Sequence, residues 1–241
     1  MSLSTIDFGR LGLQAGERLL DVGCGEGRHT LGAWLEAPVH AVGLDLSRRD
    51  LDIAEGRRQA FEDAAPEGGS ARFVCGSALD LPFPDASFDV VVCSEVLEHI
   101  FDHRGVLAEI SRVLKPGGRF VTSVPRAWPE RLCWALSDPY HEAEGGHIRI
   151  FDAARLRATV RSAGFRPTAR HWAHALHVPY WWLRCAAGGD DAAERSPLVR
   201  AWHRMLVWDL MQAPRLTRVL ERLLNPLLGK SVVLYFVKEP A

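Results

Sequence analysis

Short apolar runs alternate with helix-like patterns over the first half of the chain. Strands are predicted at 18–23, 39–44, 71–75, 88–93 and 119–124, and helices at 27–36, 47–61 and 102–114. Phe88–Cys93 contains almost no polar residue, which is typical of a strand covered on both faces. Strands that alternate with helices in this way predict βαβ units and a parallel sheet.

The second half has a different pattern. A helix is predicted at 152–163, ended by Gly164, followed by a strand at 165–171 and a last strand at 231–237. The stretch between these strands, roughly 60 residues, is too long for a plain loop in a compact domain. We therefore predict an α/β core formed by residues 1–170 and 230–241, with an inserted helical subdomain at 171–229.

Composition narrows the class of protein. The 241 residues are 47% hydrophobic and carry a net charge of −1, which fits a globular domain and gives no reason to expect a nucleic-acid partner. No apolar stretch has the length of a membrane-spanning helix, and the first residues do not resemble a secretory signal. Five cysteines without a close pair argue against a zinc knuckle and a disulfide framework. A cytoplasmic location is the expectation.

Glycines gather where the first strand turns into a helix, at Gly23, Gly25 and Gly27. Their GxGxG spacing differs from the dinucleotide GxGxxG pattern, and the carboxylate of Asp21 would repel a pyrophosphate. An ammonium group would instead gain a charge-assisted hydrogen bond from Asp21, and S-adenosylmethionine is a cationic ligand without phosphate. Asp45, at the end of the second strand, is placed to accept from ribose hydroxyls. The alternatives are a tight turn without a ligand and, for Asp45, a charge at a helix N-terminus.

These motifs together resemble the class I S-adenosylmethionine-dependent methyltransferases, close to the group that methylates small molecules. The matching segments are LLDVGCGEGRHT (19–30), VGLDLS (42–47), GSALDLPFPDASFDVVVCSEVLEHI (76–100) and LAEISRVLKPGGRFVTSVP (107–125). The resemblance implies an α/β fold of the Rossmann-like, doubly wound type. Its seven-stranded sheet would have an antiparallel last strand, and the helical insertion would come before that strand.

The resemblance also implies a cofactor site for S-adenosylmethionine. It assigns the methionine end to Asp21, Gly23, Gly25 and Ser94, the ribose to Asp45, and the adenine to Leu46, Ser77, Ala78 and Leu79. Ser77 is a departure, because the family usually has an Asp before the alanine. A serine still hydrogen-bonds an amino group, but it is neutral and shorter, and Asp80 is the alternative partner.

Methyl transfer from a sulfonium depends mainly on positioning and on exclusion of water, so no protein nucleophile is expected. For a hydroxyl acceptor a general base helps, and the candidates are His99, His141 and His147. For His99 the alternative is a structural hydrogen bond at a helix end, and for the other two a polar loop. The segment from His141 to His147 lacks the HExxH spacing of a zinc helix, so no metal is predicted.

The favoured function is therefore O-methylation of a small, hydrophobic or lipid-like acceptor. A catalytically inactive methyltransferase-like binding protein and a nucleic-acid methyltransferase are the alternatives. A pyridine-nucleotide oxidoreductase disagrees with the loop spacing and with Asp21.

The predicted insertion contains two amphipathic patterns. Apolar residues recur at helical spacing within 198–206 and 216–228, and arginines interleave with them at 200, 204, 215, 218 and 222. Such faces form a core or a homodimer interface, lie on an anionic membrane, or cap an active site that takes a hydrophobic acceptor. The cap is the favoured interpretation, with peripheral membrane contact as an addition.

Overall fold

A computed structural model describes residues 4–138, 140, 146–188, 190–212 and 214–240. The sheet strands are β1 (Arg18–Val22), β2 (His40–Asp45), β3 (Ser70–Cys75), β4 (Phe88–Ser94), β5 (Leu114–Pro125), β6 (Phe165–Ala173) and β7 (Ser231–Lys238). The helices of the core are α1 (Phe8–Leu11), α2 (Arg28–Glu36), α3 (Arg48–Ala60), η1 (Glu62–Ala64), η2 (Leu97–His99), α4 (His103–Val113), α5 (Ala127–Leu136) and α7 (Ala153–Ser162).

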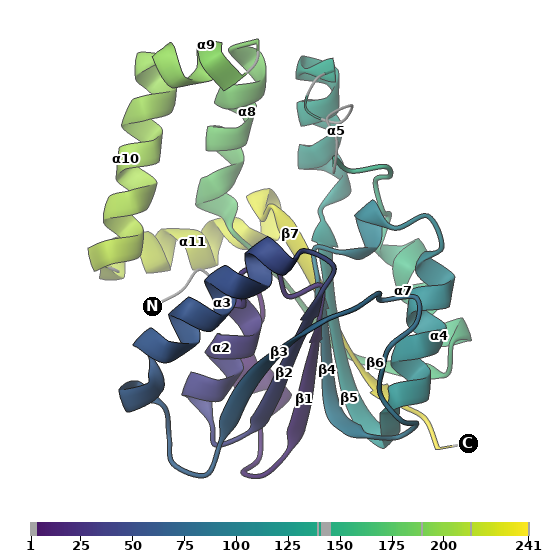
Figure 1. The fold of residues 1–241 in the computed structure, drawn as a ribbon. Helices are drawn as coiled ribbons and strands as arrows, with labels where there is room; N and C mark the ends of the chain where they lie inside the picture. Colours follow the sequence, from purple (N-terminus) through teal and green to yellow (C-terminus); the bar gives the residue numbers. More distant parts are fainter. Residues whose placement is uncertain (1–3, 139, 141–145, 189, 213, 241) are drawn as a thin grey trace.

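The seven strands form one sheet in the order β3-β2-β1-β4-β5-β7-β6. β1 to β5 pair in parallel, whereas β7 runs antiparallel between β5 and β6 (Figure 1). This topology confirms the predicted Rossmann-like fold with an antiparallel last strand. The strand order reverses between β1 and β4, and ligands of open α/β sheets bind at the carboxyl edge beside such a reversal.

Helices cover both faces of the sheet, as the apolar strands predicted. On one face, Val106 and Ile110 of α4 and Leu156 of α7 are buried in a cluster with residues of β4, β5 and β7. On the other face, Phe8 of α1 and Trp34 of α2 pack against a second cluster. Ser47 caps α3 by accepting a hydrogen bond from the Asp50 amide, as expected for an N-cap.

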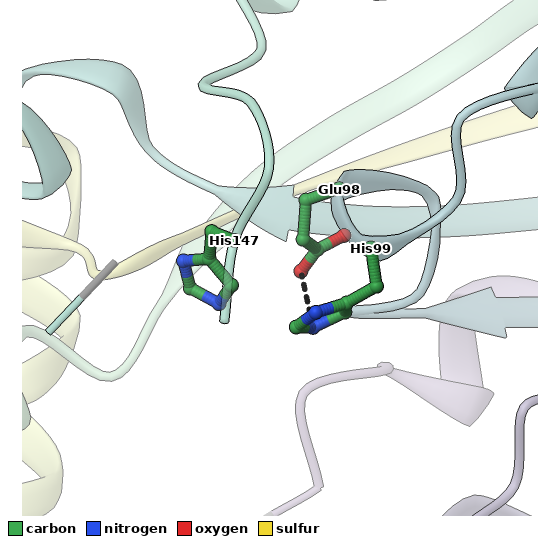
Figure 2. Close-up of side chains that lie close together, drawn as sticks. All are labelled: Glu98, His99 and His147. Atoms are coloured by element: carbon green, nitrogen blue, oxygen red, sulfur yellow. Dashed lines mark ion pairs between the residues drawn. The ribbon is translucent and has the colours of Figure 1, made fainter. Parts of the chain in front are cut away.

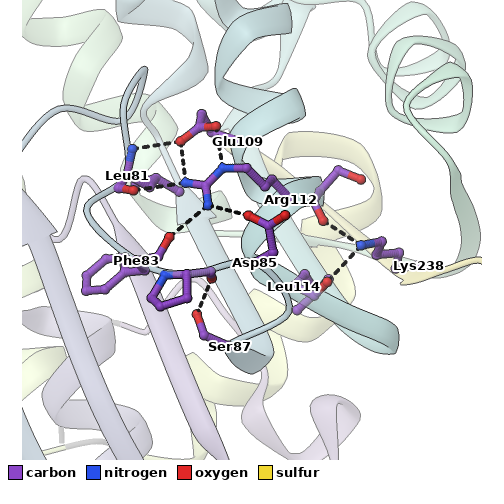
Figure 3. Close-up of polar contacts among 10 residues, drawn as sticks. Leu81, Phe83, Asp85, Ser87, Glu109, Arg112, Leu114 and Lys238 are labelled. Carbon is purple, nitrogen blue, oxygen red and sulfur yellow. Dashed lines mark hydrogen bonds and ion pairs between the residues drawn. The ribbon is translucent and has the colours of Figure 1, made fainter.

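Arg112 of α4 holds the long connection between β3 and β4 in place (Figure 3). Its guanidinium donates to the carbonyl oxygens of Leu81 and Phe83 at 2.9 and 2.7 Å and pairs with Asp85 at 2.9 Å. Glu109 supports it by pairing with Arg112 and by accepting from the Leu81 amide. The connection begins at Gly76, so this network fixes a segment that borders the candidate site described below.

Between β6 and β7 the chain is helical, as predicted. The elements are η3 (Ala175–His177), α8 (Val178–Ala186), α9 (Asp190–Arg195), α10 (Pro197–Gln212) and α11 (Arg215–Leu228). β6 extends to Ala173, so this stretch starts a few residues later than the expected boundary at 171. α8, α9 and α10 project beyond the sheet beside α5 (Figure 1). None of the described helices is long and apolar enough to cross a membrane.

Gly43 of β2 lies in a tightly packed part of the sheet next to the glycine loop, so a substitution there tests this packing. A Cβ atom there would lie 2.7 Å from Cys24 Sγ, from a ring carbon of Phe73 and from Thr30 Oγ1. We expect Gly43→Ala to lower the free energy of unfolding by about 1–3 kcal/mol, the usual cost of overpacking. Urea denaturation measures this.

Gly56 of α3 is the matched control, because a Cβ atom there meets nothing within 4 Å. Gly56→Ala should leave the free energy of unfolding unchanged or raise it by up to about 1 kcal/mol, because helices usually favour alanine over glycine by that amount. Equal effects of the two substitutions would contradict the packing described at Gly43.

Candidate active site

The glycine loop leaves β1 through a run of left-handed backbone. Gly23, Gly25 and Gly27 have φ values of 69°, 50° and 80°. At Gly23 a side chain is also excluded by contact, because a Cβ atom would lie 2.4 Å from Cγ2 of Val96. At Gly25 an added Cβ meets nothing within 4 Å. The loop is thus closely packed at Gly23 and faces open space at Gly25.

Asp45 joins the end of β2 to this loop. Its Oδ2 accepts from the Gly25 amide at 2.8 Å, and its Oδ1 accepts from the Ser47 amide at 2.9 Å. Each oxygen keeps further acceptor capacity, since a carboxylate oxygen has two lone pairs. The carboxylate therefore orders the loop and the start of α3 together and still has room for ligand hydroxyls.

A cavity of about 460 Å³, which we call the cofactor cavity, lies at the carboxyl edge beside the reversal of strand order. Its lining contains Gly23, Leu44, Asp45, Leu46, Gly76, Ser77, Ala78, Leu79, Glu95, Val96, His99, Ile100 and Phe101. Six of the residues predicted to bind cofactor line this cavity, together with His99. The segments come from the ends of β1 to β4, so the fold brings together side chains that are far apart in sequence.

Three predicted cofactor residues do not line the cavity. Gly25 faces open space in the loop, as described above. Ser94 is buried and shares a hydrogen bond with Ser123 Oγ at 2.8 Å. Asp21 is only 1% exposed beneath the loop, where its Oδ2 accepts from Thr30 Oγ1 at 2.7 Å. The other oxygen of Asp21, Oδ1, is buried without a hydrogen-bond partner among the described residues.

Ser77 is in the cavity wall, but its hydroxyl is already engaged within the turn. Its Oγ accepts from the Leu79 amide at 3.1 Å. Asp80, the alternative partner for the adenine, is exposed and lies outside the lining. A hydroxyl that accepts one hydrogen bond still has a donor to offer.

The side chains of His99 and His147 contact each other close to the start of α4. The His99 and His147 rings have centroids 5.0 Å apart, and His99 Nδ1 lies 3.2 Å from the carbonyl oxygen of Gly146. Glu98, which is fully buried, places Oε1 4.0 Å from His99 Nε2 (Figure 2). Burial, followed by the neighbouring Glu95, raises the pKa of Glu98 well above its usual value.

His147 has a stronger acidic partner on α5. Its Nδ1 lies 2.6 Å from Oε1 of Glu130, which is 3% exposed. Trp134 and Tyr140 also donate to this carboxylate, at 3.1 and 3.3 Å. Although burial opposes ionisation, the contacts with His147 lower the pKa of Glu130 overall. The ionised form is thus the stable one, held by three donors.

The outcome for the three candidate bases differs. His99 and His147 lie together, whereas His141 is outside the described residues. Donor atoms of Glu98, His99 and His147 come within 4.8 Å of one another, a spacing that also fits a metal ion. The absence of a metal therefore stays a prediction.

A second cavity of about 200 Å³ adjoins the first at Glu95, which lines both. Its other lining residues are Thr5, Arg28, His174, His177, Trp181, Lys230 and Ser231. The histidines and Trp181 come from the start of the helical stretch between β6 and β7. Among the described residues, α10 and α11 contribute to neither lining, and the cap over the active site stays a prediction.

Sequence reasoning missed Glu95 and Glu130. Glu95 has a φ of 57°, a left-handed conformation that is uncommon for a residue with a side chain and that gathers at functional sites. Its Oε1 accepts from Ser123 Oγ at 2.7 Å. The available signal for Glu130 was an acid within the otherwise largely apolar segment 127–136, which the motif search did not weigh.

Comparison with known proteins agrees with this geometry. Residues 20–122 match the family model of a methyltransferase domain. The 27-O-demethylrifamycin SV methyltransferase of Amycolatopsis mediterranei is 33% identical over 177 residues, which are 72% of this chain and 62% of that relative. The chain thus spans less than two thirds of that relative's length.

Solved structures agree on the fold. A SAM-dependent methyltransferase from Methanosarcina mazei aligns over 99% of this chain and all of its own, with a TM-score of 0.64 and 18% identity. The [4+2]-cyclase SpnF aligns over 95% of this chain and 77% of its own, with a TM-score of 0.62 and 23% identity. Fold and site thus define a Rossmann-like domain with a cavity at the carboxyl edge of its sheet. Residues 20–122 match a methyltransferase domain, and in fold the chain resembles the S-adenosylmethionine-dependent methyltransferases.

S-adenosylmethionine is the cofactor of this class, and the residues present fit it. Gly25 leaves open space beside the carboxylate of Asp45, and one buried oxygen of Asp21 has no hydrogen-bond partner within the part of the chain that the structure describes. The lining between Leu46 and Leu79 is largely apolar, as a purine ring requires.

Asp21 gives a prediction on pH dependence. Burial raises its pKa from 3.8 to about 6, although Thr30 opposes the shift. The folded state then holds a proton that the unfolded state has lost, so stability falls as the pH rises from about 4 to about 6. The component is about 3 kcal/mol. We expect Asp21→Asn to lack this pH-dependent loss of stability. In urea denaturation from pH 4 to 7, the free energy of unfolding of the variant should therefore rise relative to that of the wild type as the pH rises. A difference between the two proteins that is independent of pH would contradict this.

Proposed function

We propose that the protein transfers the methyl group of S-adenosylmethionine to a hydroxyl of a small, hydrophobic acceptor. The observation that carries this is the cofactor cavity with Asp45 and His99 in its wall and His147 in contact with His99. The rifamycin-type relative is named for methylation of an oxygen, which supports an oxygen acceptor. In this proposal the predicted cofactor residues keep their roles, with Asp45 accepting from the ribose and Leu46 and Leu79 enclosing the adenine.

An aromatic wall beside His147 favours a hydrophobic acceptor. Tyr140 contacts both His147 and Trp181, with ring centroids 6.0 and 5.8 Å apart. Trp128 of α5 contacts Trp182 of α8 at 5.5 Å. Aromatic side chains from two helices thus meet next to the second cavity, where they would hold a flat or apolar molecule by burial of its surface.

His147 is the better placed base. When its Nδ1 proton is donated to Glu130, the other ring nitrogen is left unprotonated and able to accept a proton. When bound, S-adenosylmethionine would supply the methyl group, whose bond to sulfur would break as its bond to the acceptor oxygen forms. The hydroxyl proton would pass to Nε2 of His147. Glu130 would stabilise the imidazolium that forms. His99 orients the acceptor or the cofactor from the cavity wall.

Cofactor binding is tested at Asp45. Asp45→Ala removes the acceptor for the ribose and the contacts that hold Gly25 and Ser47. Charge-assisted hydrogen bonds contribute roughly 1.5–3 kcal/mol each, so affinity for S-adenosylmethionine should fall by at least about tenfold in calorimetric titration. Asp52→Ala, which removes an exposed carboxylate of α3, is the control and should bind normally. Unchanged affinity in Asp45→Ala would remove this residue from the site.

The base is tested at His147 and Glu130. His147→Ala should lower kcat by roughly 10²–10⁴-fold with a phenolic or hydroxyl acceptor, the usual contribution of a general base. Glu130→Gln should give a smaller loss of kcat, because the imidazolium that forms on His147 would lose its negatively charged partner. His40→Ala, an exposed histidine of β2, should retain full turnover. Full activity of His147→Ala would assign the base elsewhere or show that none is needed.

The fold alone does not settle the reaction, since one structural neighbour is titled a cyclase. Transfer of a labelled methyl group to a product decides between methylation and the alternative of a binding protein. Tight cofactor binding with no labelled product from any hydroxyl acceptor would favour that alternative.

A further inference from the structure

α11 is amphipathic, but its orientation is the reverse of an ordinary surface helix. Its inward face contains Thr217, Glu221 and Asn225, spaced four residues apart and buried or half-buried, together with the half-buried Leu224 and Leu228. Asn225 Oδ1 accepts from the Ala175 amide at 3.0 Å, and the Thr217 hydroxyl donates to the Pro214 carbonyl at 3.0 Å. Polar groups therefore attach the helix to η3.

The other leucines of α11 face solvent. Leu216, Leu223 and Leu227 are each 68% exposed, and Val219 and Leu220 are 49% and 40% exposed. Their spacing of three, four and seven residues places them on one stripe of the helix. A long stripe of exposed leucines is costly in water, and such stripes mark interaction surfaces.

Basic side chains border this stripe. Arg215, Arg218 and Arg222 are exposed and recur at spacings of three and four residues, on the side of Val219. The acids nearby are turned away: Glu221 is on the inward face, where burial and then the half-buried Asp209 raise its pKa. The exposed surface of α11 is thus apolar and cationic.

The preceding helix continues these properties. At the end of α10, Val207, Trp208 and Met211 are 45%, 49% and 73% exposed, directly before the turn into α11. Arg204 is exposed one turn before them. Tryptophan is well suited to a boundary between lipid and water, because it has an apolar ring and a polar N–H group.

We propose that α11 and the end of α10 form a docking surface for an anionic lipid membrane. The leucines would enter the acyl boundary, while the arginines contact the phosphates of the headgroups. A second copy of the chain fits less well, because a two-fold interface would bring this cationic surface against itself. The proposal does not depend on the proposed methyl transfer, since membrane docking is measured without turnover.

The test is flotation of the full chain with vesicles of phosphatidylcholine, with and without phosphatidylglycerol. We expect binding to the vesicles that contain phosphatidylglycerol, weakened by salt. The double variant Leu223→Ser with Leu227→Ser should bind at least about tenfold more weakly, because two apolar side chains that would insert into the membrane are removed. Arg215→Gln with Arg222→Gln should remove the preference for phosphatidylglycerol and the effect of salt.

Phe61→Ser is the matched control, since it also removes an exposed apolar side chain, but from the end of α3. It should float like the wild type, and circular dichroism should show all variants folded. Analytical ultracentrifugation tests the alternative that a second copy of the chain occupies this surface. A dimer that dissociates in the leucine variant, without vesicle binding by the wild type, would overturn the proposal. Failure of the wild type to bind either vesicle, or equal loss in Phe61→Ser, would overturn it as well.

Discussion

The carboxylate of Asp45 is the contact on which the candidate site depends. By accepting from the amides of Gly25 and Ser47, it ties the glycine loop after β1 to the start of α3 after β2. Without that tie, a loop of three left-handed glycines would lose the order that a ligand needs, since glycine is the most flexible residue. The same carboxylate forms part of the cavity wall, so the group that orders the loop is also the one presented to the ligand.

Three buried acids of the candidate site differ in how their surroundings change the pKa of the carboxyl group. Asp21 has one hydroxyl partner and a raised pKa, Glu98 is driven towards its neutral form, and Glu130 stays ionised. The difference arises from partners rather than depth, because Glu130 receives hydrogen bonds from an imidazole, an indole and a phenol. An ionised carboxylate beside an imidazole favours proton acceptance by that imidazole, whereas Glu98, driven towards its neutral form, adds little negative charge beside His99.

The helical stretch between β6 and β7 forms part of the second cavity at its beginning and an exposed apolar surface at its end. Its beginning, from His174 to Trp181, lines the second cavity, and its end turns leucines outward. Asn225 accepts a hydrogen bond from the Ala175 amide, and Trp202 donates one to the Leu176 carbonyl, so α10 and α11 are both joined to η3. Polar contacts thus contribute to this attachment, and part of the apolar surface of α10 and α11 stays exposed.

The sequence by itself determined the α/β class, the order of strands and helices up to Pro125, the glycine loop and Asp45. These features are local: they depend on apolar periodicity, capping residues and motif spacing within short segments. The tertiary structure decided what depends on distant contacts. It brought Glu130 to His147 across 17 residues, placed Asp21 and Ser94 beneath the cavity and turned most leucines of α11 to solvent. Periodicity shows that a helix has an apolar face, but only packing against η3 determines which face is buried.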